Sequence, residues 1–222
     1  MPEYNRENIQ NEIEYSFISL FSKKIRIGVV GAGKAGTIKI RHFVKNKCYV
    51  EVLSKEFSKD ILELSKLNKN LKLISQEFNY LFLKDKHLII IALDDSIIKE
   101  KIKKYCDDNY KIYIDSTDFK EGMAVVPAER SSRTVNIAVN TNGGNPKGSV
   151  WAAEKLRKVM IKDDDYIEFT TQIRNKAKDI PQYKNEIINF VFTEEFRESF
   201  DKGKGIASIK DKFPEEIINK LF

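Results

Sequence analysis

The segment KIRIGVVGAGKAGTIKIRHF, residues Lys24–Phe43, decides the class of fold. A run of branched apolar residues leads into three closely spaced glycines, and a segment of helical periodicity follows. Gly31 permits a tight turn out of a strand, Gly33 lets the backbone approach a pyrophosphate, and Gly36 lets the next helix pack close to the strand. The helix N-terminus offers unpaired amides to phosphate groups. We therefore expect a nucleotide-binding loop, rather than a simple tight turn, made of Gly31, Ala32, Gly33, Lys34, Ala35 and Gly36.

Around this segment, short β-branched runs alternate with longer runs of helical period as far as Asp115. The expected strands are IRIGVV (25–30), YVEVL (49–53), LKLIS (71–75), HLIIIAL (87–93) and KIYID (111–115). The expected helices are TIKIRHFVKN (37–46), SKDILELSKLN (58–68) and SIIKEKIKKYC (96–106). This alternation predicts an α/β fold with a Rossmann-type parallel sheet.

The remainder of the chain leaves this alternation. MAVVPA (123–128) and TVNIAVNT (134–141) are strand candidates without a clear helix between them, and the turn signal NGGNPKG (142–148) follows. Five amphipathic helices are then expected: WAAEKLRKVM (151–160), DYIEFTTQIRNKA (165–177), NEIINFVF (185–192), TEEFRESF (193–200) and PEEIINKLF (214–222). We thus expect an N-terminal arm (1–23, with residues 7–21 helical or irregular), a dinucleotide-binding domain (24–121), a connecting region (122–150) and a helical domain (151–222).

The composition is that of a globular protein. Hydrophobic residues make up 41% and charged residues 32% of the 222 residues, and no apolar run reaches the roughly 20 residues of a membrane span. Without a secretory signal, we expect a cytoplasmic protein. The two cysteines and two histidines lack metal-ligand spacing, so we expect no metal site. The net charge of +6 favours anionic ligands, but without an aromatic RNA motif we expect no nucleic-acid partner.

Two further loops at the ends of strands are candidate cofactor contacts. An acidic residue usually holds the ribose at the end of the second strand, but here Ser54 and Lys55 stand in its place. Ser54 could bond the ribose and Lys55 a 2′-phosphate, so NAD is expected and NADP stays open. After the fourth strand, Leu93 and Asp94 are expected near the cofactor, whereas Asp95 fits the N-cap of the next helix.

Four stretches taken in order resemble the siroheme-synthase family of precorrin-2 dehydrogenases. They are FISLFSKKIRIGVVGAGKAG (17–36), IIIALDDSIIKEKI (89–102), YIDSTDFKEGMAVVPAE (113–129) and VNIAVNTNGGNPKGSVWAAEKLRKVM (135–160). The specificity lies in the series, since the glycine loop alone is shared by many enzymes. The resemblance implies NAD-dependent oxidation of precorrin-2 to sirohydrochlorin, followed in some members by iron insertion. It also implies a homodimer in which a central dimerisation region follows the Rossmann domain, with strands exchanged between subunits.

The resemblance also implies a set of site residues. The family's catalytic aspartate follows the fifth strand, where this chain offers Asp118 and Asp115; Asp118 is favoured because it falls in the loop that should face the cofactor. A carboxylate there could take or relay the proton lost by the macrocycle. A substrate contact is implied for Thr141, with Asn142 beside it. Because the substrate carries carboxylates, the candidate cations for it are Lys147, Arg130, Arg133, Arg174 and Lys178.

Two other functions stay open on sequence grounds. The unusual DSTDF loop and the missing ribose acid also fit a catalytically silent dinucleotide-binding protein, such as a redox sensor that partners a tetrapyrrole enzyme. The positive charge fits a nucleic-acid-binding module less well. Formation of NADH from precorrin-2 would distinguish a precorrin-2 dehydrogenase from these two alternatives.

Overall fold

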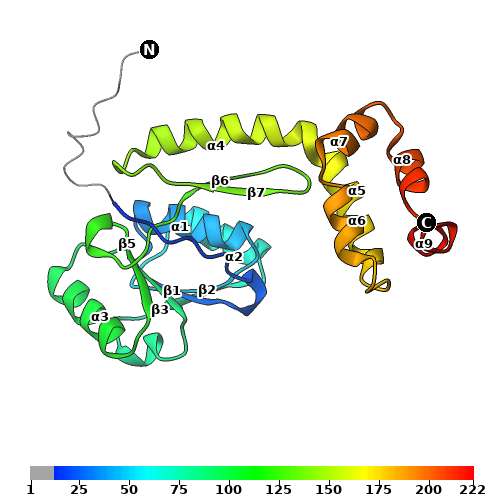
Figure 1. The fold of residues 1–222 in the computed structure, drawn as a ribbon. Coiled ribbons are helices and arrows are strands. Elements are labelled where there is room, and N and C mark those ends of the chain that lie inside the picture. Colours follow the sequence, from blue (N-terminus) through cyan, green and yellow to red (C-terminus); the bar gives the residue numbers. More distant parts are fainter. Residues whose placement is uncertain (1–12) are drawn as a thin grey trace, which may run out of the picture. The chain divides into compact units, whose positions relative to one another are not determined.

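A computed structural model describes residues 13–222, which divide into two compact units (Figure 1). The first unit is Ser16–Val126, and the second is Pro127–Phe222 with the described residues 13–15. The expectation of a helix or irregular arm over residues 7–21 falls partly outside the described residues. From residue 13 to Phe21 the chain has no regular secondary structure, and a 3-10 helix, η2 (Ser22–Lys24), precedes the sheet.

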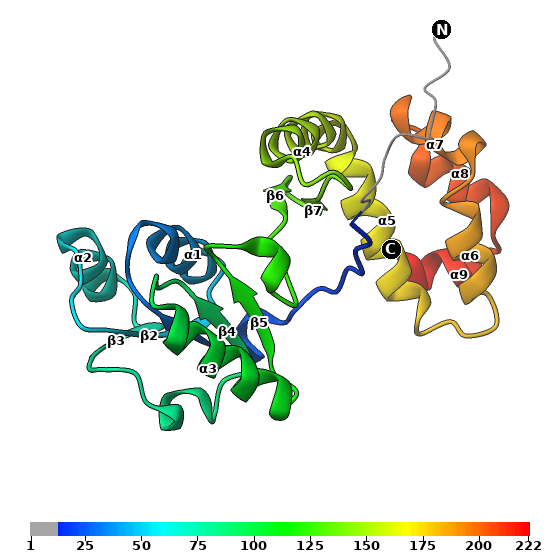
Figure 2. The ribbon, with the colours of Figure 1, turned by 90° about the vertical axis from the view of Figure 1, so that its left-hand side faces the viewer.

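The first unit is a five-stranded parallel sheet with strand order β3-β2-β1-β4-β5, which confirms the expected α/β fold. Its elements are β1 (Arg26–Val30), α1 (Lys34–Lys45), β2 (Tyr49–Ser54), α2 (Lys59–Leu67), β3 (Leu71–Ser75), η3 (Tyr80–Leu83), β4 (Leu88–Ile91), α3 (Ser96–Asp108), β5 (Ile112–Asp115) and η4 (Phe119–Glu121). Helices α1 and α2 cover one face and α3 covers the other (Figure 2). All the strand ends that carry candidate site residues therefore lie at one edge of the sheet.

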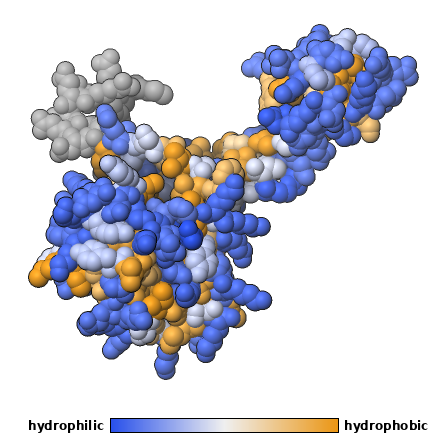
Figure 3. All heavy atoms as spheres, turned by 90° about the horizontal axis from the view of Figure 1, so that it is seen from below, coloured by the Kyte–Doolittle hydropathy of each residue, from blue (hydrophilic) through white to orange (hydrophobic). Residues whose placement is uncertain are grey.

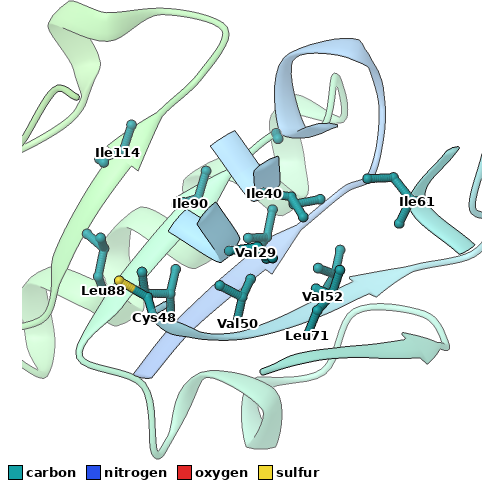
Figure 4. Packing of buried hydrophobic residues seen from close by; sticks show 13 residues of the cluster. Val29, Ile40, Cys48, Val50, Val52, Ile61, Leu71, Leu88, Ile90 and Ile114 are labelled. Carbon is teal, nitrogen blue, oxygen red and sulfur yellow. The ribbon is translucent and has the colours of Figure 1, made fainter. Parts of the chain in front are cut away.

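Branched side chains fill the space between the sheet and the two helices on its first face. Val29, Val52 and Ile90 come from neighbouring strands, in a register that pairs Val29 with both of the others. Ile40 of α1 packs onto them, and all four side chains are fully buried (Figure 4). Each such burial stabilises the fold by about 1.5–3 kcal/mol, which explains why the apolar runs become central strands.

The expectation of a strand over 123–128 is wrong. Met123 and Ala124 both donate their backbone N–H to the carbonyl of Tyr113, and the strand β6 begins only at Ala128 (Ala128–Ser131). Pro127, which lacks an N–H, cannot donate to a ladder of hydrogen bonds. β6 pairs in antiparallel register with β7 (Asn136–Val139), which lies inside the expected strand 134–141. The strand after Pro127 and the strand within 134–141 are therefore partners of each other within one chain, which our sequence analysis did not foresee.

The second unit continues into helices. They are α4 (Pro146–Met160), η5 (Ile161–Asp163), α5 (Asp164–Ala177), α6 (Lys184–Phe190), α7 (Glu194–Asp201), α8 (Gly205–Lys212) and α9 (Glu215–Leu221). α4 lies along the hairpin and starts five residues before the expected position 151, because Asn145 caps Gly148 N–H and Pro146 fits the first helical turn. α8 was missed, since the glycines around it indicate a joint.

One buried carboxylate fastens the hairpin turn to the helices. Asp164, at the start of α5, accepts hydrogen bonds from Ser132 Oγ (2.7 Å), Thr134 N (2.9 Å) and Arg133 N (3.1 Å). The Thr134 hydroxyl and these donors hold the pKa of Asp164 below its usual range despite desolvation. Elsewhere hydrophilic side chains cover most of the surface visible in Figure 3, as the 32% of charged residues predicts.

Candidate functional site

Three loops meet at the carboxyl edge of the sheet. They follow β1, β4 and β5, and backbone hydrogen bonds keep the strands in step at this point: Ala92 N donates to Val30 O at 2.8 Å, and Ser116 N donates to Ile91 O at 2.9 Å. The structure thus brings the glycine loop, the loop of Leu93 and Asp94, and the loop of Asp118 to the same edge, where open α/β sheets bind their ligands.

The glycine loop has the tight geometry that its sequence predicts. Gly31 has φ +99°, and a Cβ on it would lie 2.2 Å from the carbonyl oxygen of Ala92. A Cβ on Gly36 would lie 2.5 Å from the carbonyl oxygen of Gly31. Larger residues at either position would push the loop away from β4 or α1 away from the loop. These two glycines therefore set the close approach of strand, loop and helix.

Gly33 has a different environment, because a Cβ there would find nothing within 4 Å. It is the N-cap of α1 and offers no side chain to the first-turn amides of Lys34, Ala35 and Gly36. Uncapped amides beside open space are the arrangement that receives a phosphate. This cradle fits the pyrophosphate of a dinucleotide, with Ala32 completing the loop.

An acidic residue that the sequence did not predict for this site, Glu77, lies near the end of β2. Ser54 is half-buried, while the exposed Lys55 ammonium lies 3.0 Å from the carboxylate of Glu77, which follows β3. The register of β2 on β3, in which Ser54 is opposite Ser75, brings these loops together. The sequence alone gave no signal for this pair, because the two residues lie 22 positions apart and only strand pairing joins them.

The loop after β4 separates two neighbouring aspartates. Asp95 caps α3 by accepting the N–H of Ile98 at 3.0 Å, which confirms its expected structural role. Asp94 is exposed and Leu93 half-buried beside it. Asp94 therefore remains the carboxylate of this loop that can meet a ligand.

Asp115 ends β5 and is 1% exposed. Its Oδ1 atom accepts hydrogen bonds from Thr117 Oγ1 (2.8 Å), Thr117 N (2.9 Å) and Asp118 N (3.0 Å). Burial alone would raise the pKa of this carboxyl, but these donors and the Lys99 ammonium hold it well below its usual range. Asp115 is thus a buried anion whose Oδ1 atom, through three hydrogen bonds, fixes the start of the next loop.

Asp118, three residues further on, is exposed. It is the N-cap of η4, where its Oδ1 accepts the N–H of Lys120 at 3.1 Å. The Asp118 carboxylate keeps access to solvent and to a ligand at this edge. The two aspartates of the DSTDF segment therefore differ in kind: one is buried within a network, and the other is presented on the surface.

The expected substrate-binding residues lie in the second unit. Thr141 Oγ1 accepts the N–H of Asn145 at 2.7 Å and so shapes the turn before α4. Asn142 and Lys147 are exposed on the same turn. Arg130 pairs with Glu154 at 3.1 Å and Arg133 with Glu168 at 3.0 Å, so these two cations already have partners in this unit.

Residues 13–222 lack the features of two other classes of site. No group of three or more His, Cys, Asp or Glu side chains is placed to hold a metal ion in this part of the chain. Within the same range, no helix combines the length and apolar character that a membrane span needs.

Comparison with known proteins identifies the first unit. The family model described as "Putative NAD(P)-binding" matches residues 18–128, half of the 222-residue chain. The chain belongs to this NAD(P)-binding family. The matched range contains the glycine loop, the end of β2 and both aspartates of the DSTDF segment, and the cofactor class of this domain is a nicotinamide dinucleotide.

Relatives extend the likeness into the second unit. A "Putative precorrin-2 dehydrogenase" of Methanocaldococcus jannaschii is 28% identical over 193 residues, which are 80% of this chain and 90% of the relative. A "Siroheme synthase" of Buchnera aphidicola subsp. Acyrthosiphon pisum is 24% identical over 144 residues, 65% of this chain but only 30% of that protein. The solved structure titled "SirC, precorrin-2 dehydrogenase" superposes with a TM-score of 0.67 at 20% identity, covering 90% of this chain and all of the other, and so shows the same fold.

Proposed function

We propose that the protein is a precorrin-2 dehydrogenase, which oxidises precorrin-2 to sirohydrochlorin in siroheme biosynthesis. The observation that carries this proposal is the juxtaposition, at one sheet edge, of a dinucleotide cradle at Gly33 and an exposed carboxylate at Asp118. The named relative from Methanocaldococcus jannaschii supports it over 80% of the chain.

In this reaction the chain supplies binding, orientation and a proton acceptor. When bound, the nicotinamide ring accepts the hydride that leaves the macrocycle. The amides of Lys34, Ala35 and Gly36 hold the pyrophosphate, Ser54 bonds the adenosine ribose, and Leu93 and Asp94 border the cofactor. Asp118 takes the proton that the macrocycle loses, and Asp115 keeps its loop in place. Within the second unit, Lys147 is a cation that can attract a carboxylate of the tetrapyrrole, and Thr141 and Asn142 offer polar atoms on the same turn.

We further propose that NAD is preferred to NADP. The Lys55 ammonium, the cation best placed for a 2′-phosphate at the end of β2, already lies 3.0 Å from the Glu77 carboxylate. A 2′-phosphate would have to compete with that carboxylate and would be repelled by it. Since both side chains are largely exposed, the preference is expected to be modest and to weaken with salt.

A spectrophotometric assay tests the proposed function. Precorrin-2 is incubated with the protein and NAD or NADP, with and without ferrous iron, and absorption spectra follow NADH and the tetrapyrrole. We expect sirohydrochlorin and NADH to form at equal rates, faster with NAD than with NADP. A protein that binds NAD but forms no NADH from precorrin-2 is instead the silent dinucleotide-binding protein. Further conversion to siroheme only in the presence of iron would add the chelatase step.

We also propose that the active protein is a homodimer built on the β6–β7 hairpin. Among the described residues, this hairpin has no third strand, and an isolated two-stranded hairpin is only marginally stable in water. α4 lies along it, so the outer strand edges are the parts that a second copy can cover. Light scattering at micromolar concentration is expected to give twice the 25.8 kDa of one chain. A monomer mass throughout this range would contradict the dimer.

A further inference from the structure

Two lysines of α3 point their ammonium groups at the β5 loop. Lys99 Nζ lies 3.0 Å from Asp115 Oδ2, and Lys103 Nζ lies 3.4 Å from the same oxygen. The side chains of Lys99 and Lys103 are only 16% and 9% exposed. Lys103 also reaches Glu121, at the end of η4, at 3.3 Å. The helix is therefore joined to both ends of the segment that carries Asp118.

Lys99 has a second contact, which makes the connection specific. Its ammonium donates to Thr117 Oγ1 at 2.5 Å, and the Thr117 hydroxyl donates in turn to Asp115 Oδ1 at 2.8 Å. Lys99, Thr117 and Asp115 thus form a closed ring of polar contacts. Because Asp115 Oδ1 also accepts the N–H of Asp118, the ring ends on the backbone of the proposed proton acceptor.

The position of Lys99 is unfavourable for a lysine on local grounds. It lies in the first turn of α3, where its N–H donates to the carbonyl of the N-cap residue Asp95 at 2.9 Å. A cation near a helix N-terminus is disfavoured by the helix dipole, and partial burial of its ammonium group adds a desolvation cost. The buried Asp115 carboxylate offsets both costs. Lys99 therefore ties the first turn of α3 to the loop after β5.

We propose that Lys99 is a positioning residue, which holds residues 116–121 against α3 and thereby orients Asp118 for proton transfer. This inference rests on the proposed function for its catalytic part. Lys99 touches neither cofactor nor substrate in this scheme. Its removal should let the loop move while the dinucleotide cradle around Gly33, on another loop, stays intact.

The test compares Lys99→Met, which keeps the stem and removes the charge, with Lys99→Arg, which keeps the charge. In Lys99→Met we expect kcat for precorrin-2 oxidation to fall by about 10²-fold, the scale of a small misplacement of a catalytic group. The KM for NAD should stay within about twofold of the parental value, because the substitution leaves the groups proposed to bind NAD in place. Lys99→Arg should recover a large part of the lost kcat. Lys101→Met, an exposed lysine of the same helix, is the matched control and should behave as the parent.

Amide hydrogen exchange followed by mass spectrometry provides a measurement that needs no turnover. In Lys99→Met, we expect exchange over residues 116–121 to quicken by about tenfold while the sheet strands keep their protection. Unchanged exchange there would overturn the inference, and so would faster exchange with parental kcat. If the parent itself does not oxidise precorrin-2, the proposed function fails, and the exchange result still decides whether Lys99 holds the loop.

Discussion

Replacing Gly33 by Asp is expected to remove binding of both NAD and NADP while leaving the protein folded. Gly33 has φ −67° and ψ −172°, a conformation that any residue adopts, and a Cβ there meets nothing within 4 Å. The Asp side chain would therefore fit the protein but would occupy the space of the pyrophosphate and repel its charge. We expect the affinity to fall by at least about 10²-fold, measured by calorimetric titration at constant ionic strength.

Two further variants separate the causes of this loss. Gly33→Ala adds only the Cβ to the same open space and should lose much less affinity than Gly33→Asp. Gly143→Asp makes the same chemical change at another glycine whose added Cβ meets nothing within 4 Å, in the turn before α4. It should keep parental affinity for the cofactor. If a folded Gly33→Asp protein bound both nucleotides as tightly as the parent, the dinucleotide site would have to lie elsewhere.

The sheet could be predicted from the sequence because its signals are local. Residues 88–93 are apolar throughout, as is typical of a strand buried on both faces, and Gly31 indicates the turn that follows the first strand. The cap at Asp95 needs only a favoured residue before a helical period. Each of these features depends on a few neighbouring residues, so the order of strands and helices was confirmed.

The hairpin and the polar networks depend instead on contacts between distant positions. The extended run 123–126 looks like a strand, but the carbonyl of Tyr113 and the missing N–H of Pro127 give its backbone another course. Glu77 becomes relevant to the cofactor only because β3 lies beside β2. In the same way, Lys99 on a helix looks like a solvated lysine until the position of Asp115 is known.

Replacing Asp118 by Asn is expected to lower kcat for precorrin-2 oxidation by roughly 10²-fold or more, the scale of general acid–base catalysis. The substitution keeps the shape of the exposed side chain, and the amide oxygen can still accept the N–H of Lys120 as the cap of η4. Affinity for NAD should change little, because the cradle at Gly33 lies on another loop. Thermal unfolding of the variant should match the parent, so the loss would report the missing carboxylate.

Asp115→Asn is the paired measurement, and it should differ in kind. Asn at this buried site removes the anion that the Lys99 and Lys103 ammonium groups share, so the unfolding temperature should fall at pH 7. Because the folded-state pKa of Asp115 lies below its unfolded value of about 3.9, its stabilisation is present above that pH and is lost as pH falls. The difference in stability between parent and Asp115→Asn should therefore shrink below about pH 4.

Turnover of the two variants then assigns the chemistry. With folding checked in both, near-normal kcat in Asp118→Asn and loss of kcat in a stable Asp115→Asn would transfer the proton-accepting role to the buried carboxylate. That result would mean that substrate binding opens the network of Thr117 and Lys99, since all donors to Asp115 now hold it as an anion that accepts no further proton near neutral pH. Parental kcat in both variants would remove carboxylate catalysis from the β5 loop altogether. The exposed Asp118 carboxylate needs no such rearrangement. We therefore expect Asp118→Asn to lose more kcat and less stability than Asp115→Asn.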